Sequence, residues 1–173
     1  MSMKALFFAA GAGGGACGSL STDQVPTMTS NTAPSGTASA ADETYELAWK
    51  SFNNATGVGW TSLAVTGAII YDFGSGNGFI CKGYSLSAAT VNRARMAKDW
   101  TLEGANGGAY TTLDTVTGET AWSADEKRSY SAIADADFSN DTSYYQYKIN
   151  VSANNGSGGA LEIGEIELYE CGD

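Results

Sequence analysis

From residue 24 onward the chain consists of short stretches in which apolar and polar residues alternate, separated by turns rich in glycine and asparagine. In Asp99 to Glu103 the alternation places Trp100 and Leu102 on the opposite strand face from Thr101 and Glu103. Residues 106–108, Asn-Gly-Gly, then tolerate the positive φ angles of a tight turn, and residues 110–114 form the next strand. Many short strands separated by turns predict an all-β sandwich or barrel.

The same patterning predicts the remaining elements. We expect further strands at residues 37–40, 68–73, 79–88, 129–133, 145–151 and 161–169. A short helix or turn is expected at 43–52, where one face carries Tyr45, Ala48, Trp49 and Phe52. No long amphipathic helix is present in the sequence, which excludes a parallel α/β sheet. Alternating strand positions predict a core of Trp60, Ile70, Phe73, Trp100, Leu102, Leu113, Tyr147, Ile149, Val151, Ile166 and Leu168.

Composition and charge narrow the class of protein. The chain of 173 residues has 22 glycines, 2 prolines and only 16% charged residues, which is typical of all-β proteins outside the cytosol. Its nine basic residues are dispersed and the net charge is −10, so we expect no binding to nucleic acid or to an anionic membrane. No apolar run approaches the roughly 18 residues that span a bilayer, and we expect no membrane insertion.

Residues 1–23 form a Gly/Ala-rich segment whose apolar side chains are concentrated at residues 6–8, Leu-Phe-Phe. Three such side chains do not offset the entropy of ordering some twenty residues, so the segment cannot form a core alone. We expect an extended arm, residues 1–23, that anchors residues 24–173 to neighbouring subunits. The first 17 residues resemble a lipoprotein signal only in outline, because the apolar run is short and Gly14 replaces the expected leucine. We therefore expect the arm to be retained.

Three cysteines are present, with no histidine and no metal-ligand spacing. Cys81 lies in an apolar run and is interpreted as a small buried side chain. Cys17 and Cys171 lie near the two ends and are the disulfide candidates, either within one chain or between chains.

A series of motifs resembles the discoidin-like domain, also called coagulation factor 5/8 type C, in its bacteriophage form. The series begins at Gln24 with QVPTMTSNTAPSGTASA and continues with AWKSFNN, GWTS and DFG. KDWTLEGANGGAYTTLDTVTGETAW follows, similar to the family's W-x-L-x-G-S-N-D-G, T-L-D and G-E-x-W. YQYKINVSANNG and IGEIELY resemble the closing pair of strands. The resemblance covers about residues 24 to 170.

This resemblance implies a jelly-roll β-sandwich of about eight strands, whose relatives commonly bind glycans through loops at one end. It also implies a structural calcium ion in many members, between an F-D-G loop and the last strand. Here Asn53 and Asn54 replace the aspartate and glycine of that loop. Asn53 and Thr56 could offer neutral oxygens and Glu165 a charge. Alternatively, Asn53, Asn54 and Gly57 simply form the turn.

The sequence offers little for catalysis. Without histidine no Ser-His-Asp set is possible. The pairs Asp135–Asp137 and Asp125–Glu126 lie in polar segments where carboxylates are normally solvated, and no other cofactor motif is present. We therefore expect no enzyme activity and no cofactor other than the calcium considered above.

A sugar site needs aromatic faces and a few fixed polar groups. Trp49, Trp60, Trp100 and Trp122 occupy positions that the family uses for its core. We therefore favour loop residues as ligand candidates, with Arg93 and Arg95 expected on one strand face; ordinary exposed loop chemistry is an equal alternative. The candidates are Phe79, Asn92, Arg93, Arg95 and Tyr144.

Together these features predict a bacteriophage virion structural protein, from a tail fibre, a tail tip or a capsid decoration. We expect a homo-oligomer that contacts other virion subunits through residues 1–23 and displays its sandwich for adhesion to a host-surface glycan, neutral or basic because of the charge of −10. The alternative is a secreted bacterial carbohydrate-binding module or lectin.

Overall fold

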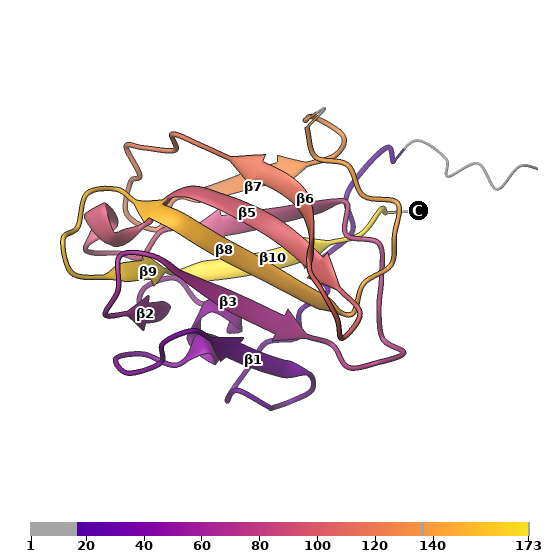
Figure 1. The fold of residues 1–173 in the computed structure, drawn as a ribbon, viewed down its shortest axis with the longest axis horizontal. Helices are drawn as coiled ribbons and strands as arrows, with labels where there is room; N and C mark the ends of the chain where they lie inside the picture. The colour runs from indigo at the N-terminus through magenta and orange to yellow at the C-terminus, as the bar shows by residue number, and fades with distance from the viewer. Residues whose placement is uncertain (1–16, 136, 173) are drawn as a thin grey trace, which may run out of the picture.

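The computed structural model describes residues 17–135 and 137–172 (Figure 1). Within these residues the chain forms ten strands and two short 3-10 helices. In order they are β1 (Thr37–Ala40), η1 (Ala48–Phe52), β2 (Trp60–Ser62), β3 (Gly67–Asp72), β4 (Gly83–Ser87), η2 (Arg93–Arg95), β5 (Ala97–Ala105), β6 (Thr111–Val116), β7 (Lys127–Ser131), β8 (Gln146–Asn154), β9 (Leu161–Ile163) and β10 (Glu165–Tyr169).

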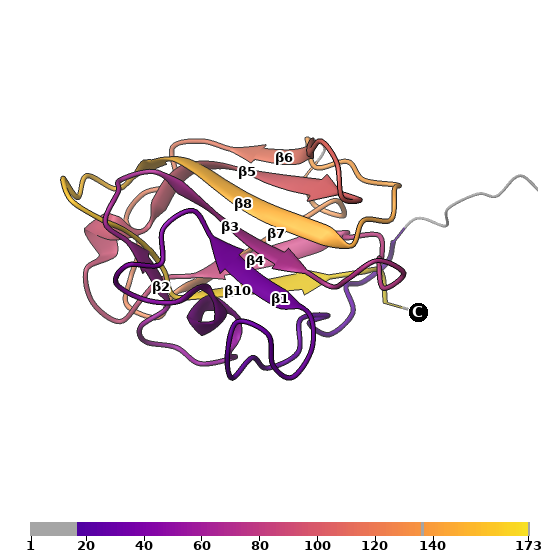
Figure 2. The ribbon, with the colours of Figure 1, turned by 60° about the horizontal axis from the view of Figure 1, so that its bottom comes forward.

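These strands form a β-sandwich, as the sequence predicts. One layer is a five-stranded sheet in the order β1-β3-β8-β5-β6, and the opposite layer contains β10-β4-β7 (Figures 1 and 2). A short pair, β2 with β9, extends the structure at one end. All recorded pairings are antiparallel, which suits a sheet with one face on a shared core and the other toward solvent. Among the described residues no helix is long and apolar enough to cross a membrane.

The core lies between the two layers. Its largest fully buried side chains are Trp60, Trp100, Tyr71, Tyr84, Tyr147, Met28, Ile69, Leu86, Met96, Leu102, Leu161 and Ile163. The predicted core residues on β5, β6, β8 and β10 are buried, as is Trp60. Ile70 is the exception: Ile69 and Tyr71 point inward, and Ile70 lies on the outer face beside Lys148. Phe73 is only partly buried, packed against the core.

A buried polar network joins the two layers. Trp100 on β5 donates a hydrogen bond from Nε1 to the Tyr84 hydroxyl on β4 at 2.9 Å. Tyr84 in turn donates to Asp114 Oδ2 on β6 at 2.7 Å. Burial raises the pKa of the Asp114 carboxyl. The network fixes the position of one sheet relative to the other, because Trp100 Nε1, the Tyr84 hydroxyl and Asp114 Oδ2 are partnered across the two layers.

Several predicted boundaries are wrong for local reasons. The predicted strand at residues 161–169 is two strands, because Gly164 interrupts it where the chain passes the backbone of Ala88; a Cβ there would lie 2.9 Å from the Ala88 carbonyl carbon. Of the short helix or turn expected at 43–52, η1 is the helical part, and Tyr45 lies outside it, 64% exposed. Arg93 and Arg95 lie on the 3-10 helix η2 and not on a strand. The strand β2 was not predicted.

Residues near both ends of the described part of the chain meet beside β10. Cys17 and Cys171 form a disulfide with a Cα–Cα distance of 5.4 Å, and Cys81 is a buried free thiol. Ser21 N–H donates to Glu170 C=O at 3.0 Å, continuing this attachment. The part of the expected arm that the structure describes, residues 17–23, therefore lies against the sandwich. Residues 1–16, with the apolar residues 6–8, lie outside the described residues.

Candidate functional site

The predicted ligand residues lie at two opposite ends of the sandwich. The terminal end, where β8 begins and residues 17–23 lie against β10, is on the right of Figure 1. It holds Tyr144, just before β8, and Phe79, which forms an isolated bridge with Tyr144. The loop end holds Asn92, Arg93 and Arg95 beside the loops at residues 117–126 and 155–160 (Figure 1). The nine residues of β8 separate the two ends by about 30 Å of extended chain. The structure therefore does not bring the five candidates into one site.

At the terminal end the aromatic candidates are packed against other rings. Phe79 and Tyr144 exchange backbone hydrogen bonds at 3.2 and 3.1 Å. The Phe79 ring lies 5.0 Å from the Tyr147 ring and 5.2 Å from the Phe73 ring, between centroids. The Tyr147 hydroxyl donates to the Phe79 carbonyl at 2.5 Å. These faces serve the core, so they offer little free surface for stacking a sugar.

At the loop end, three segments enclose a surface cavity of about 190 Å³. We call it the loop-end cavity; it is lined by Arg93, Ala94, Ala121, Trp122 and Asn155. Asn155 holds two of the segments together, since its backbone N–H donates to the Met96 carbonyl at 3.0 Å. Its side-chain Nδ2 donates to the carbonyls of Met96 and Ala97, both at 3.1 Å. Both amide hydrogens are thereby used, which fixes the side chain and leaves Oδ1 as an acceptor.

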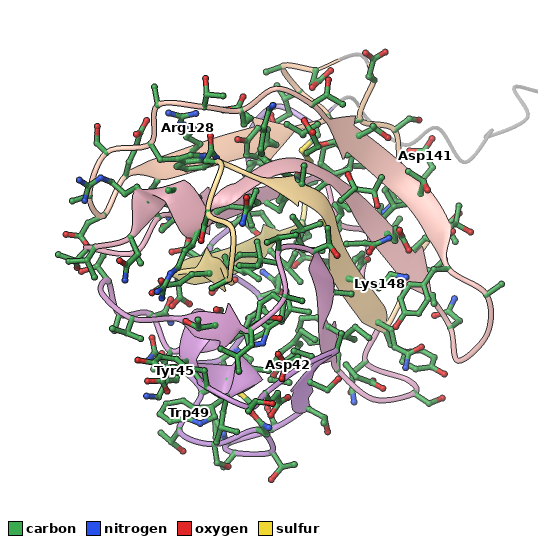
Figure 3. The ribbon with its side chains drawn as sticks, turned by 60° about the vertical axis from the view of Figure 1, so that its left-hand side comes forward. Asp42, Tyr45, Trp49, Arg128, Asp141 and Lys148 are labelled. Carbon is green, nitrogen blue, oxygen red and sulfur yellow. A yellow bond between two sulfur atoms is a disulfide. The ribbon has the colours of Figure 1, made fainter. Side chains whose placement is uncertain are left out.

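Arg128 on β7 holds the loop at 117–126 in place (Figure 3). Its guanidinium lies 4.1 Å from the centre of the Trp122 ring, a cation–π contact. It also donates to the carbonyls of Thr120 and Ala121, at 3.0 and 3.3 Å, and pairs with Glu119 and with Glu126. Pairing with Arg128 lowers the pKa of the Glu126 carboxyl. One side chain thus satisfies several loop groups and makes the loop rigid.

Unusual backbone angles gather around this cavity. Of the four non-glycine residues with positive φ in the described part of the chain, three lie in the loops that flank it: Asn92, Ala121 and Asp125, with φ of 58, 57 and 56°. The αL region suits asparagine and aspartate, but alanine gains nothing there from its side chain. Such conformations persist where surrounding contacts hold them, and they are concentrated at functional sites.

The two arginines of η2 differ in their partners. Arg95 lies 3.7 Å from the carboxylate of Glu162, which is 4% exposed at its side chain. Burial raises the pKa of Glu162, and Arg95 acts in the opposite direction. Arg93 is exposed and donates from Nη1 to the Thr90 carbonyl at 3.0 Å. Across residues 17–135 and 137–172, Arg93 has no carboxylate within 4.0 Å, so its charge is available to a ligand.

A second part of the loop end is organised by Asp42. Its carboxylate accepts hydrogen bonds from the backbone N–H groups of Thr44 and Leu63, at 2.9 and 2.8 Å, and from the Thr44 hydroxyl at 2.5 Å. These bonds, led by that of the Thr44 hydroxyl, lower the pKa of Asp42 to about 2. Tyr45 is presented on the outside next to this turn, with Trp49 close by (Figure 3).

The loop that the resemblance associates with calcium is held by hydrogen bonds. Glu165, 4% exposed, accepts the Asn54 N–H at 3.1 Å, and Asn53 Oδ1 accepts the Ala55 N–H at 2.9 Å. Thr56 is exposed. Calcium prefers about six to eight oxygen ligands, several of them carboxylates. No group of three or more acidic, histidine or cysteine side chains gathers anywhere in the described residues.

Among the described residues, this loop offers fewer oxygen ligands than a calcium ion prefers. The backbone N–H groups of Asn53 and Asn54 direct partial positive charge at Glu165, the carboxylate that the resemblance assigns to this loop. Burial raises the pKa of Glu165 to about 8, and its second oxygen, Oε2, has no hydrogen-bond partner among the described residues. Asn54, with φ of 54°, forms the turn, as the simpler interpretation of the sequence expects.

The carboxylate pairs considered for catalysis are ordinary turn residues. Asp135 Oδ1 accepts the backbone N–H of Asp137 at 2.9 Å, and Asp125 Oδ1 accepts the Thr90 hydroxyl at 2.7 Å. Asp125 and Asp137 are both exposed, outside the apolar setting that a general acid needs.

Solved structures that share this architecture are carbohydrate-binding modules and related domains. The family 32 module of NanJ from Clostridium perfringens, in complex with galactose, has 18% identity and a TM-score of 0.61, over 78% of this chain and 93% of that chain. A chitosan-binding module from a Paenibacillus chitosanase/glucanase has 17% identity and a TM-score of 0.60, over 78% and 95%. An F5/8 type C domain from Bacteroides fragilis has 11% identity and a TM-score of 0.61, over 79% and 91%.

The fold is that of a discoidin-like jelly roll. The sequence resemblance on the motifs from Gln24 onward is therefore confirmed at the level of the fold. No protein-family model matches the sequence, and no curated protein matches it significantly. At these identities the structural likeness shows the fold alone.

Sequence reasoning found one side of the loop-end cavity and missed the other. Arg93 was a candidate, whereas Ala121 and Asn155 were not, and Trp122 was interpreted only as core. Ala121 carries no chemical signal, because its role lies in its backbone angle. Asn155 lies in the Asn-Asn-Gly turn after β8, where asparagine is expected for the turn itself. The loop-end cavity forms where three loops that are distant in sequence come together, so a local sequence pattern does not predict it.

Proposed function

We propose that this domain binds carbohydrate at its loop end, without catalysis. The observation that carries the proposal is the loop-end cavity, where Arg93 has a free guanidinium and Asn155 a free amide oxygen. Small-molecule sites combine a concave surface with a few fixed polar groups, and fixed donors and acceptors suit sugar hydroxyls. Solved structures of this fold in complex with galactose, or described as chitosan-binding, support the assignment.

The direct test is affinity electrophoresis or a glycan array with the oligomerised domain, which raises weak binding through multivalency. Asn155→Ala should weaken binding of any glycan that the wild-type domain binds, and Ile80→Ala, an exposed position at the terminal end, should not. A failure of the wild-type domain to bind any glycan would contradict the proposal. The release of a reaction product would contradict its non-catalytic part.

The setting of the domain is a further part of the proposal. A disulfide such as Cys17–Cys171 is typical of proteins outside the reducing cytosol. Display on a bacteriophage particle, with residues 1–23 bound to neighbouring subunits, rests on the resemblance of the sequence to phage domains. A secreted carbohydrate-binding module accounts for the fold and the disulfide equally well.

Mass spectrometry separates the two settings. A virion protein is recovered from purified particles with its first residues intact, and deletion of residues 2–16, which keeps Cys17, prevents its incorporation. A secreted module is found free in the medium. Normal incorporation of the truncated chain into particles would contradict the anchoring role of residues 1–16.

A further inference from the structure

The free side-chain hydrogen-bond donors of the loop-end cavity come from Arg93, because Trp122 Nε1 and Asn155 Nδ2 already donate to backbone carbonyls. A guanidinium has five N–H donors, and Arg93 uses Nη1 toward the Thr90 carbonyl in the described structure. That bond orients the planar group and leaves its other edges free. The fixed acceptor in the cavity is Asn155 Oδ1, which no donor among the described residues contacts. A matching ligand presents acceptors to Arg93 and a hydroxyl donor to Asn155.

The cavity lacks the features that usually give a neutral sugar its affinity. Trp122 is 5% exposed, and the guanidinium of Arg128 lies 4.1 Å from the centre of its ring, so this ring offers no open face for stacking. The five lining residues also include no carboxylate to accept bonds from sugar hydroxyls. Charge is therefore the strongest source of affinity that the cavity contains.

We propose that the loop-end cavity selects a sugar that carries a carboxylate, such as a hexuronic acid, with the carboxylate bound by Arg93. The inference rests on the proposed carbohydrate-binding function and names its ligand class. A planar guanidinium binds a carboxylate through two parallel hydrogen bonds, which give direction as well as strength. A ring hydroxyl of the same sugar then donates to Asn155 Oδ1.

The charged groups around the cavity are consistent with this selection. Arg95 is paired with Glu162, and Arg128 with Glu119 and Glu126, so these groups largely neutralise one another. Asp125 is an exposed carboxylate that is linked to Arg93 through Thr90. Its Oδ1 accepts a hydrogen bond from the Thr90 hydroxyl, and the Thr90 carbonyl accepts one from Arg93. The negative charge of Asp125 therefore disfavours the binding of an anion in the loop-end cavity.

The net charge of −10 also disfavours an acidic glycan at long range. Salt screens such repulsion beyond about 8 Å at physiological ionic strength, whereas a direct Arg93–carboxylate contact lies well inside that distance. The cavity can therefore bind an acidic residue of a glycan although the protein as a whole is acidic. This inference departs from the expectation of a neutral or basic glycan, which considers net charge alone.

The experiment compares each acidic sugar with its neutral counterpart. Oligomers of galacturonate, glucuronate and mannuronate, and a sialylated oligosaccharide, are titrated into the full domain by calorimetry, alongside analogues whose carboxyl group is reduced to an alcohol. At least one acidic oligomer should bind about tenfold or more tightly than its reduced analogue. Arg93→Gln should bring the acidic oligomer to the level of the neutral one.

Two variants sharpen this result. Lys98, like Arg93, has no carboxylate within 4.0 Å among the described residues, but it lies outside the cavity lining. Lys98→Gln should therefore leave the preference for the acidic oligomer unchanged. Asp125→Asn should strengthen binding of the acidic oligomer only. Thermal melting should show all three variants folded, because Arg93, Lys98 and Asp125 are outside the core.

The outcomes separate the inference from the function on which it rests. Equal binding of acidic and reduced oligomers, or an Arg93→Gln variant that weakens both equally, overturns the inference and leaves carbohydrate binding standing. If no acidic oligomer binds but a neutral glycan does, the inference is likewise wrong. If no glycan of either kind binds the wild-type domain, the proposed function itself fails.

Discussion

The two ends of the sandwich use similar loop residues in opposite ways. At the terminal end, Phe79 and Tyr144 bind each other through the backbone and pack against the core, and the disulfide closes the chain beside them. At the loop end, Arg93 and Asn155 are fixed by backbone carbonyls but keep polar atoms free. Aromatic residues in loops therefore do not by themselves mark a binding surface in this fold. What distinguishes the loop end is polar groups that are fixed and still unsatisfied.

The largest expected effect is at the terminal end. Phe79→Ala removes a ring that touches Tyr147 and Phe73 and should lower the free energy of unfolding by about 3–5 kcal/mol. Denaturant unfolding measures this, with the exposed neighbour Ile80→Ala as the control that changes stability little. A Phe79→Ala variant as stable as the wild type would show that this end is not built on aromatic packing.

The disulfide gives the next largest effect. Cys17 and Cys171 are 154 residues apart in sequence, so their bond restricts nearly the whole unfolded chain. Replacing both by serine should cost about 2–4 kcal/mol of stability. Glycan binding measured at a temperature where the variant is folded should be unchanged, because the cavity lies at the other end. If binding falls together with stability, the two ends are not independent.

Stability should also depend on pH through Glu165. Its pKa is raised by burial from 4.5 to about 8, so between these values the folded state binds more protons than the unfolded state. The free energy of unfolding therefore decreases as pH rises through this window, by at most about 1.4 kcal/mol per pH unit. Asp23, with a pKa raised to about 6 by burial, acts in the same direction.

Melting temperatures of Glu165→Gln across this range measure the effect. The glutamine amide keeps an oxygen that accepts the Asn54 N–H, but it does not titrate, so the decrease of melting temperature with rising pH should be smaller. Asp42→Asn is the control: the pKa of Asp42 is lowered to about 2, so the stability it contributes is lost only as pH falls below about 4. A wild-type profile that rises between pH 5 and 8 would contradict the environment assigned to Glu165.

The smallest expected effect is that of calcium. Millimolar calcium and a chelator should give the same melting temperature for the wild-type domain, because Glu165 is already bonded to the Asn54 N–H. The double substitution Asn53→Asp and Asn54→Gly adds a second carboxylate and should make the melting temperature rise when calcium is added. A calcium-dependent increase in the melting temperature of the wild-type domain would show that the loop at residues 53–57 is a metal site.

How far the sequence predicts this molecule depends on the range of the interaction. Alternation predicts β5, β6 and β8 and their buried faces, since the strand period is local. In β3 the adjacent Ile69 and Ile70 make the period ambiguous, and the wrong face was chosen. The break at Gly164 and the cavity formed with Asn155 depend on segments distant in sequence, which no local pattern encodes.

The central claim, that the loop end binds carbohydrate and the terminal end does not, is tested most directly by mapping a ligand on the domain. The measurement is the change in backbone amide chemical shifts of the labelled protein during titration with the acidic oligomer that binds most tightly. The account predicts that the changes cluster at residues 90–95, 118–122 and 155–157. Changes concentrated around Phe79 and Tyr144, or on the open face of the five-stranded sheet, would contradict it.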